Sequence, residues 1–406
     1  MTHRFARLRR FRFNLPQRIA AGLLLCFLAQ GFWLISRQTL SDRDYQYARC
    51  GRETWERPSA LSGYYTSCGN IHDGILAYRL AGLPLSLNLL LERALDRFRA
   101  PENRVFQDAQ DSAVPVSTWE LRHQLTHTLL LLRLPFLVVG CLLGGALWWV
   151  TRRMFGNLGG YTALALYCFS PAILRACTEP NTEVLAALGV FGGVYTCIGV
   201  AHAIQGPRRK WRPRIVLLVA AFAIAAAAHI AALPVVALLG LAFMLWVAEE
   251  RRAQVLPIVL VATIGAIVAV FVCYGFSPDA FSYVFRSPAG LLWVSLDPAR
   301  RFFFDLPHAG IALAAAAALL LYLALSRSRY FGNTAPLLCT LVCMVLVMTG
   351  TQGAPWLWAI PFLLTFISGV FADAYESAQP RMAMAAGGVL VLLQAACSVA
   401  SLAGIL

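Results

Sequence analysis

The sequence contains little charge. Charged residues make up 13% of its 406 residues, whereas about a quarter is usual in a soluble domain. Lysine is nearly absent, because Lys210 is the only lysine among 34 basic residues, and this preference for arginine is typical of a GC-rich bacterial genome. Long polar linkers and repeats of fixed period are also missing. These absences exclude an ordinary soluble domain and predict one domain over residues 1–406.

Sequence motifs for metal binding are missing too. Neither a CxxC pair nor an HExxH motif occurs, so spacing predicts no metal ligands. Nine of the eleven cysteines lie in apolar segments, where cysteine normally acts as a small packing residue. Only Cys50 and Cys68 lie in a polar region.

Apolar runs dominate the sequence. Hydrophobic residues make up 59% of the chain, and its mean hydropathy is +0.65. Runs of about 20 apolar residues predict transmembrane helices, so the expected fold class is an all-α polytopic membrane protein. We predict about eleven spans, at residues 17–36, 129–150, 159–177, 184–204, 213–229, 232–248, 255–275, 308–326, 335–350, 355–372 and 383–404. The pair 213–248 is too long for one span and is read as two.

Basic residues orient these spans. Arginines precede the first span, and further clusters occupy every second loop, at 152–153, 206–214, 249–252 and 326–329. Because basic residues collect in cytoplasmic loops, we expect a cytoplasmic N-terminus in a bacterial inner membrane. The net charge of +14 then reflects membrane topology, and no nucleic-acid partner is predicted. The outer side receives the loops 37–128 and 276–307 and the C-terminus.

The first outer loop is long and acidic. It contains 11 of the 20 acidic residues. Within it, residues 74–98 form an amphipathic pattern that predicts a helix lying flat at the membrane interface. Cys50 and Cys68 both belong to this loop, and an oxidising periplasm favours a disulfide between them. The aromatic residues of the second loop are expected to lie at the depth of the lipid headgroups. Trp356 and Trp358 are interpreted as residues of the aromatic belt at the membrane interface.

Several motifs then occur in a recognisable order. An Arg-Leu-Pro at 133–135 stands at the outer end of a span, and Arg152-Arg153 and a glycine turn at 156–160 stand at its inner end. Pro171 follows, and Glu183 opens the next span about a dozen residues later. The first outer loop opens with an acidic residue, Asp42, followed by a tyrosine, and residues 354–369 form an aromatic-proline span.

This order resembles the GT-C glycosyltransferases, membrane enzymes that use polyprenyl-phosphate sugars, such as protein O-mannosyltransferases and aminoarabinose transferases. The resemblance touches most of the chain and is best over residues 133–188. The chain departs from the family pattern in three places. Asp42 is followed by Arg43 where the family often has Asp-Glu, the second acidic residue is Glu183 where aspartate is common, and His72-Asp73 stand near a missing proline-proline-leucine.

The chemistry of sugar transfer selects the candidate residues. A base must remove the proton of the acceptor hydroxyl, and positive charge must stabilise the departing phosphate. The predicted catalytic residues are Asp42 as the base, with Asp44 and Glu183. The predicted donor-binding residues are Arg43, Tyr45, His72, Asp73, Arg175, His229, Arg300 and Arg301. No metal ligand is assigned, although a divalent cation is kept as a candidate cofactor.

Each of these residues also has a non-catalytic reading. Asp42 or Asp44 can be a solvated helix end, Glu183 can serve only to interact with a helix dipole, and the arginines can contact lipid headgroups.

The predicted function is the transfer of a sugar from a polyprenyl-phosphate donor to a periplasmic acceptor of unknown identity, which can be a lipid, a glycan or a protein. The alternatives are a transporter or flippase of lipid-linked glycans, and a polymerase or ligase acting on them. A transporter normally places decisive polar residues near the middle of its spans. Here the acidic residues gather on one side instead, and this favours surface chemistry.

Overall fold

The computed structural model describes residues 14–56, 74–98, 118–205, 208–284, 300, 308–324, 330–348, 356–377 and 380–403. Regular structure in these ranges is entirely helical. In chain order the helices are α1 (Leu15–Arg37), α2 (Asp42–Glu56), α4 (Ile75–Phe98), α6 (Thr118–Cys168), α7 (Pro171–Thr178), α8 (Glu183–Ile204), α9 (Arg208–Ala228), α10 (Ala232–Val247), η3 (Arg252–Gln254), α11 (Val255–Cys273), α12 (Pro278–Tyr283), α14 (Ala309–Ala324), α15 (Tyr330–Met348), η6 (Trp356–Trp358), α16 (Ile360–Tyr375) and α17 (Pro380–Leu402).

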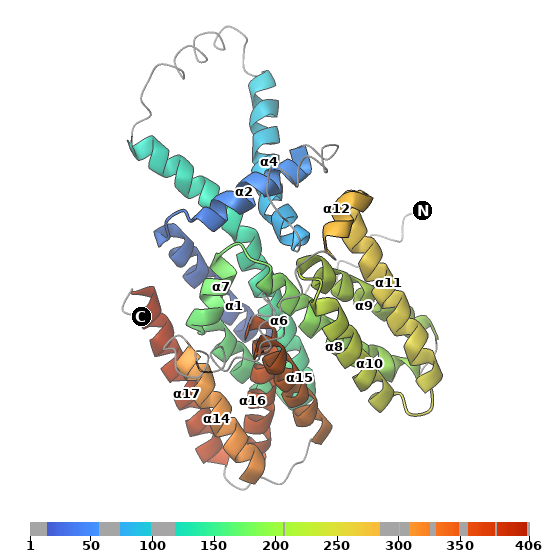
Figure 1. Ribbon diagram of the computed structural model, residues 1–406. Helices are drawn as coiled ribbons and strands as arrows, with labels where there is room; N and C mark the ends of the chain where they lie inside the picture. The colour runs from blue at the N-terminus through green and yellow to red at the C-terminus, as the bar shows by residue number, and fades with distance from the viewer. Residues whose placement is uncertain are drawn as a thin grey trace, which may run out of the picture.

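The predicted fold class, an all-α polytopic membrane protein, is confirmed. Seven helical stretches in the described part of the chain are long and apolar enough to cross a membrane. One of them, His127–Cys168, holds two predicted spans, so the seven account for eight of the eleven predictions. The other three are the shorter apolar helices α10, α14 and α15. Figure 1 shows most of these helices running side by side in one bundle.

Helix α6 is a hairpin of two antiparallel helices. Its backbone turns at Gly156, whose φ of +78° lies in the left-handed region that favours glycine. The two arms then pack closely, and the Tyr167 hydroxyl donates a hydrogen bond of 2.6 Å to the Gly140 carbonyl across them. The prediction that 159–177 is one continuous span is wrong. It breaks before Pro171, and Ser170 caps the new helix α7 by accepting from the amide of Ile173.

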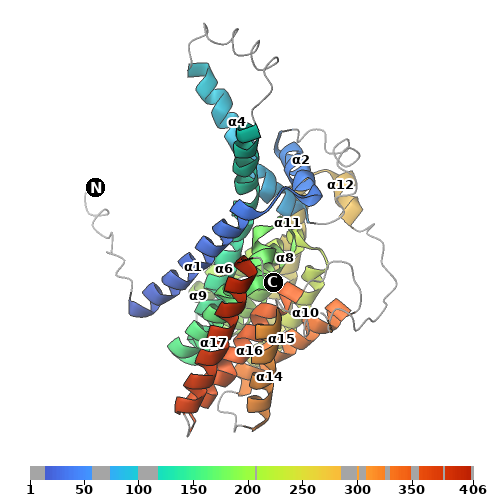
Figure 2. The ribbon, with the colours of Figure 1, turned by 90° about the vertical axis from the view of Figure 1, so that its left-hand side faces the viewer.

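Arginines bind helix carbonyls at one end of the bundle. Arg214, Arg251 and Arg252 donate hydrogen bonds to the carbonyls of Gly199, Ile204 and Leu245 respectively, and the bonds to Ile204 and Leu245 satisfy carbonyls that have no partner within α8 and α10. These helix ends lie far from α2, α4 and α12, which occupy the other end of the bundle in Figures 1 and 2. We call the latter the α2 end. Arg214, Arg251 and Arg252 therefore lie at the end of the bundle opposite α2.

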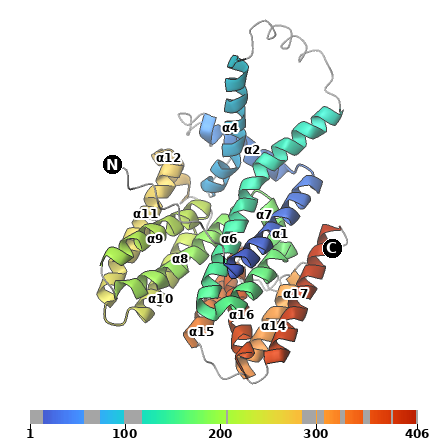
Figure 3. The same ribbon diagram turned by 180° about the vertical axis from the view of Figure 1, so that it is seen from behind.

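Helix α4 is confirmed as a helix, and its position relative to the membrane surface stays a prediction. Figure 3 shows it rising from the bundle along the direction of the spans. It crosses α2 where two glycines meet, since a Cβ on Gly82 would lie 2.1 Å from the carbonyl carbon and oxygen of Gly51. Tyr47 and Tyr78 stack beside this crossing with ring centroids 4.2 Å apart. The apolar face of the first half of α4 therefore packs on α2 rather than on lipid.

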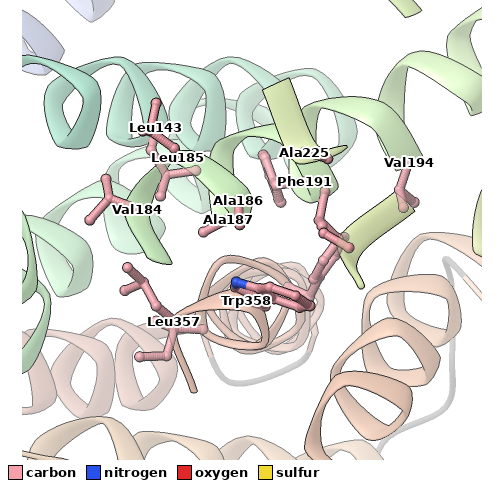
Figure 4. Close-up of a cluster of buried hydrophobic side chains, with 14 of the residues drawn as sticks. Leu143, Val184, Leu185, Ala186, Ala187, Phe191, Val194, Ala225, Leu357 and Trp358 are labelled. Atoms are coloured by element: carbon pink, nitrogen blue, oxygen red, sulfur yellow. The ribbon is translucent and has the colours of Figure 1, made fainter. Parts of the chain in front are cut away.

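The core near the α2 end forms around α8. Figure 4 shows Trp358 of η6 beside Ala187 and Phe191 of α8, with Ala225 of α9 close by, and all four side chains are fully buried. The reading of Trp358 as an exposed belt residue is therefore wrong, because only 1% of it is exposed. The small side chains of α8 and α9 let these helices approach closely, as is usual between membrane helices.

The predicted division of residues 213–248 into two helices is confirmed. Helix α9 ends at Ala228 and α10 begins at Ala232, with His229 at the break. Cys50, on α2, is disulfide-bonded, whereas the nine other described cysteines are free thiols. A disulfide at Cys50 was expected from the sequence, and its predicted partner, Cys68, lies outside the described residues.

Candidate active site

Four short segments meet at the α2 end. They are the first turn of α2, the loop between α7 and α8, the turn between α9 and α10, and η6. The contacts between these segments bring together several of the residues predicted from the sequence.

Asp44 is a buried anchor of the first turn of α2. None of its surface is exposed, and Arg133 is only 2% exposed. Arg133 donates from Nε to Asp44 Oδ1 at 2.9 Å, and its Nη2 donates to Asp44 Oδ2. This is the two-bond geometry in which arginine binds a carboxylate most strongly. The ion pair therefore joins α2 to the first arm of α6.

Ser41 completes the anchor. Its backbone N–H and its hydroxyl both donate to Asp44 Oδ2, at 2.8 and 2.7 Å, and its Oγ accepts from the Asp44 amide at 3.2 Å. This is a capping box at the start of a helix. Burial alone would raise the pKa of Asp44, but the hydrogen bonds from Arg133 and Ser41 outweigh it and lower the pKa below the ordinary value. Asp44 is thus held as a carboxylate whose oxygens are already engaged.

Asp42 has the opposite environment. Its side chain is exposed, as are those of Arg43 and Tyr45. Arg43 Nη1 lies 4.0 Å from Oε2 of Glu179, at the end of α7, and both of these side chains are about half exposed. Arg43 also interacts electrostatically with Glu183. The first turn of α2 therefore faces the loop that carries two carboxylates.

Asn181 organises that loop. Its amide Nδ2 donates to the carbonyls of Ala176 and Glu179, and its Oδ1 accepts from the amides of Glu183 and Val184, at 3.0 and 3.2 Å. One side chain thus closes α7 and caps α8. Glu183 becomes the first residue of α8, where a negative charge interacts favourably with the helix dipole.

His229 lies on the other side of Glu183. The two residues interact electrostatically, and the imidazole packs edge-on against Trp358 with ring centroids 5.3 Å apart. The backbone amide of Ala231 donates to Nδ1 of His229 at 3.3 Å. Because Nδ1 accepts this bond, the proton of the neutral ring lies on Nε2, which makes Nε2 a donor.

The start of α4 contacts the residues that precede Glu183 and His229. Gly74 has a φ of +79°, and a Cβ there would lie 2.3 Å from Cγ2 of Thr182. It would also lie 3.4 Å from the carbonyl oxygen of Ala228. The chain therefore enters α4 directly beside the residues that precede Glu183 and His229. The preceding residues, His72 and Asp73, lie outside the described residues.

The remaining predicted residues are more scattered. Arg175, on α7, donates a hydrogen bond of 3.0 Å to Ser401 near the end of α17. Arg300 is exposed, and Arg301 lies outside the described residues. Within the described residues no group of three histidine, cysteine or acidic side chains is arranged to hold a metal ion.

Sequence reasoning assigned no role in this arrangement to Ser41, Arg133, Glu179 or Asn181. The role of Ser41 could have been predicted, because Ser-x-x-Asp at 41–44 has the spacing of a capping box. Arg133 had a weaker signal, since an arginine within an apolar span usually has an acidic partner, but nothing in the sequence indicates which acid. Glu179 precedes a proline in a loop, and only the fold brings it to Arg43.

The fold matches a solved structure. The crystal structure of the Archaeoglobus fulgidus oligosaccharyltransferase in its apo form superposes with a TM-score of 0.53, over 96% of this chain and 56% of that chain, at 10% sequence identity. The chain therefore shares the fold of the matched part of that protein. This confirms the structural side of the resemblance inferred from residues 133–188.

The match concerns the fold. The chain spans little more than half the length of the archaeal enzyme. No protein-family model matches the sequence, and no curated protein sequence matches it. The activity has to be argued from the residues at the α2 end.

Proposed function

We propose that this protein is a membrane glycosyltransferase that transfers a sugar from a polyprenyl-phosphate donor to an acceptor at the α2 end of the bundle. The observation that carries the proposal is that Arg43, which is next to the exposed Asp42 in the first turn of α2, faces the Glu179–Glu183 loop at one end of a GT-C fold. Exposed carboxylates and cations thus meet at the edge of an apolar bundle, where a lipid-linked substrate and a water-borne acceptor can both arrive.

Asp42 is the proposed general base. It is exposed and is not part of the ion pair that engages Asp44, so its oxygens can accept the proton of an acceptor hydroxyl. The acceptor oxygen forms a bond to the anomeric carbon of the sugar while the bond from that carbon to the phosphate oxygen breaks. The polyprenyl phosphate leaves with the electron pair of that bond, and the proton remains on the carboxylate.

Three cationic or donor groups suit the departing phosphate. Arg43 is exposed beside the proposed base, Arg175 lies on α7 below the same loop, and Nε2 of His229 carries a proton next to Glu183. Positioned positive charge stabilises the phosphate as the bond breaks. Glu183 has the role of orienting Arg43 and His229, because it interacts with both.

The orientation in the membrane follows from the arginines. The end of the bundle that carries Arg214, Arg251 and Arg252 is proposed to face the cytoplasm of a bacterium, and the α2 end the periplasm. A Gln46→Cys variant tests this, because Gln46 is exposed on α2. An impermeant maleimide should label it in spheroplasts without lysis, and labelling only after lysis would reverse the orientation.

Transfer itself is tested with purified protein in vesicles that contain acceptors extracted from the host envelope. Each of a panel of polyprenyl-phosphate sugars is supplied in turn, and release of polyprenyl phosphate is measured. Asp42→Asn should lower the rate by about 100- to 10,000-fold without changing the melting temperature. Arg49→Gln is the matched control, since Arg49 is exposed on the same helix.

Two results would count against the proposal. If Asp42→Asn and Arg49→Gln turn over equally fast, Asp42 is not the base. If the wild type releases no polyprenyl phosphate from any donor, while vesicles reconstituted with it move lipid-linked sugars between leaflets, the protein is a flippase.

A further inference from the structure

The buried ion pair between Asp44 and Arg133 lies directly beneath the proposed base. Asp42 and Asp44 are two residues apart in the first turn of α2, and Arg43 lies between them. We infer that Arg133 and Asp44 are positioning residues, which hold this turn so that Arg43 faces the Glu179–Glu183 loop with Asp42 fixed next to it. The inference rests on the proposed function for its catalytic meaning.

The contacts around Arg133 favour this role. Besides the two bonds to Asp44, Nη1 of Arg133 donates to the side chain of Gln38, and Nη2 donates to the carbonyl of Thr39 at 3.2 Å. These two residues form the connection between α1 and α2. One guanidinium therefore binds the end of α1, the connection and the first turn of α2 together. The whole path leading to Asp42 is tied to α6.

General stability alone would not require this arrangement. A buried ion pair can often be replaced by apolar side chains of similar volume without loss of stability, because the pair must first be removed from water. What apolar side chains do not reproduce is the directional bonding to Gln38 and Thr39. Hydrogen bonds fix the orientation of the groups they join, and apolar packing does so much less. A base and a phosphate-binding arginine need a fixed orientation, since a displacement of about 1 Å can cost about 100-fold in rate.

The test compares single and double replacements. Asp44→Leu and Arg133→Met each leave one buried charge without its partner, whereas the double variant leaves neither. The double variant should therefore melt close to the wild type, and each single variant should melt lower. Arg153→Gln is the control, because Arg153 lies on the same helix α6 and is exposed.

The decisive measurement is the rate of transfer in the double variant. If the pair positions the first turn, kcat in the double variant should stay about 100-fold below the wild type, although its stability has recovered, and KM for the donor should change less than kcat. Recovery of kcat together with stability would mean that the pair only supports the fold, and would overturn the inference.

A second measurement does not depend on catalysis. Hydrogen exchange should report the amides of Asp44 and Tyr45, which donate to Ser41 Oγ and to the Ser41 carbonyl. Exchange there should rise by about tenfold or more in the double variant and stay unchanged in Arg153→Gln. Unchanged exchange would overturn the inference even if transfer were found. If the wild type transfers no sugar but exchange is faster in the double variant, the anchoring of this turn stands. Only the proposed function is then rejected.

Discussion

The crossing of α2 and α4 leaves no room for a side chain, and Gly82→Ala should therefore separate the two helices. A Cβ on Gly82 would lie 2.1 Å from the carbonyl carbon and oxygen of Gly51, and backbone atoms cannot rotate away as a flexible side chain can. Because carbon atoms in contact normally lie about 3.5–4.0 Å apart, the helices would have to move apart by well over 1 Å. The stacked rings of Tyr47 and Tyr78 beside the crossing would lose contact as well.

The magnitude follows from two opposing terms. Overpacking against a rigid neighbour costs about 3 kcal/mol, the upper part of the usual range, while replacing glycine by alanine within a helix returns about 1 kcal/mol. Gly82→Ala should thus destabilise the protein by about 2 kcal/mol. Gly199→Ala is the matched control, because a Cβ on Gly199 of α8 meets no atom within 4 Å, and it should be neutral or stabilising by up to about 1 kcal/mol.

Apparent melting temperatures of the purified variants, recorded at one scan rate by intrinsic fluorescence, give the comparison. Gly82→Ala should melt below the wild type and Gly199→Ala at or above it. Equal melting temperatures for the two variants would show that α2 and α4 do not cross at these glycines, and would remove the basis for the position of α4.

Two further predictions concern α2. Because its interactions lower the pKa of Asp44 below its ordinary value, the stability that this carboxylate contributes is fully present above about pH 4 and is lost as the pH falls through its folded pKa. Melting curves should show this acid loss in the wild type and less of it in the Asp44→Leu, Arg133→Met double variant, and equal losses would contradict the assignment. Because Cys50 is disulfide-bonded, reduction with dithiothreitol should lower the stability by about 3 kcal/mol for a loop of the predicted length, whereas a Cys50→Ser variant should not respond to the reductant.

The sequence could predict the helical spans because their signal is local. An apolar run of sufficient length needs no information about its neighbours, and the division at His229 followed from length alone. The break at Ser170 was harder to see, since an apolar run continues on both sides of it. There the signal was Pro171, which favours the first turn of a new helix, and its meaning depended on Ser170 acting as a cap.

The position of α4 could not be predicted from its own residues. An amphipathic pattern shows which face of a helix is apolar, but it does not show what covers that face. The expectation of a lipid contact concerned the second half of the helix, where Leu87 and Leu91 are exposed, whereas Ala77, Tyr78 and Ala81 in the first half are buried. The cover of the first half is α2, and the reason lies in two glycines about 30 residues apart in the chain, Gly51 and Gly82, whose contact only the fold creates.

The acidic pair at the start of α2 was predicted as a site with Asp42 as the base, but the burial of Asp44 and its ion pair were not predicted. Residues two apart on a helix point about 200° away from each other, so one of Asp42 and Asp44 had to face the bundle if the other faced water. The sequence does not say which, because the partner that decides it, Arg133, comes from 89 positions further along the chain. Burial of Asp44 then has a consequence for its neighbour. With one carboxylate neutralised by Arg133, the first turn of α2 is fixed to α6, and Asp42 remains exposed on a turn that cannot rotate without breaking a buried ion pair. A mobile carboxylate at a membrane surface would be a solvated helix end. A carboxylate on an anchored turn, next to Arg43, has the fixed geometry that the proposed role of general base requires.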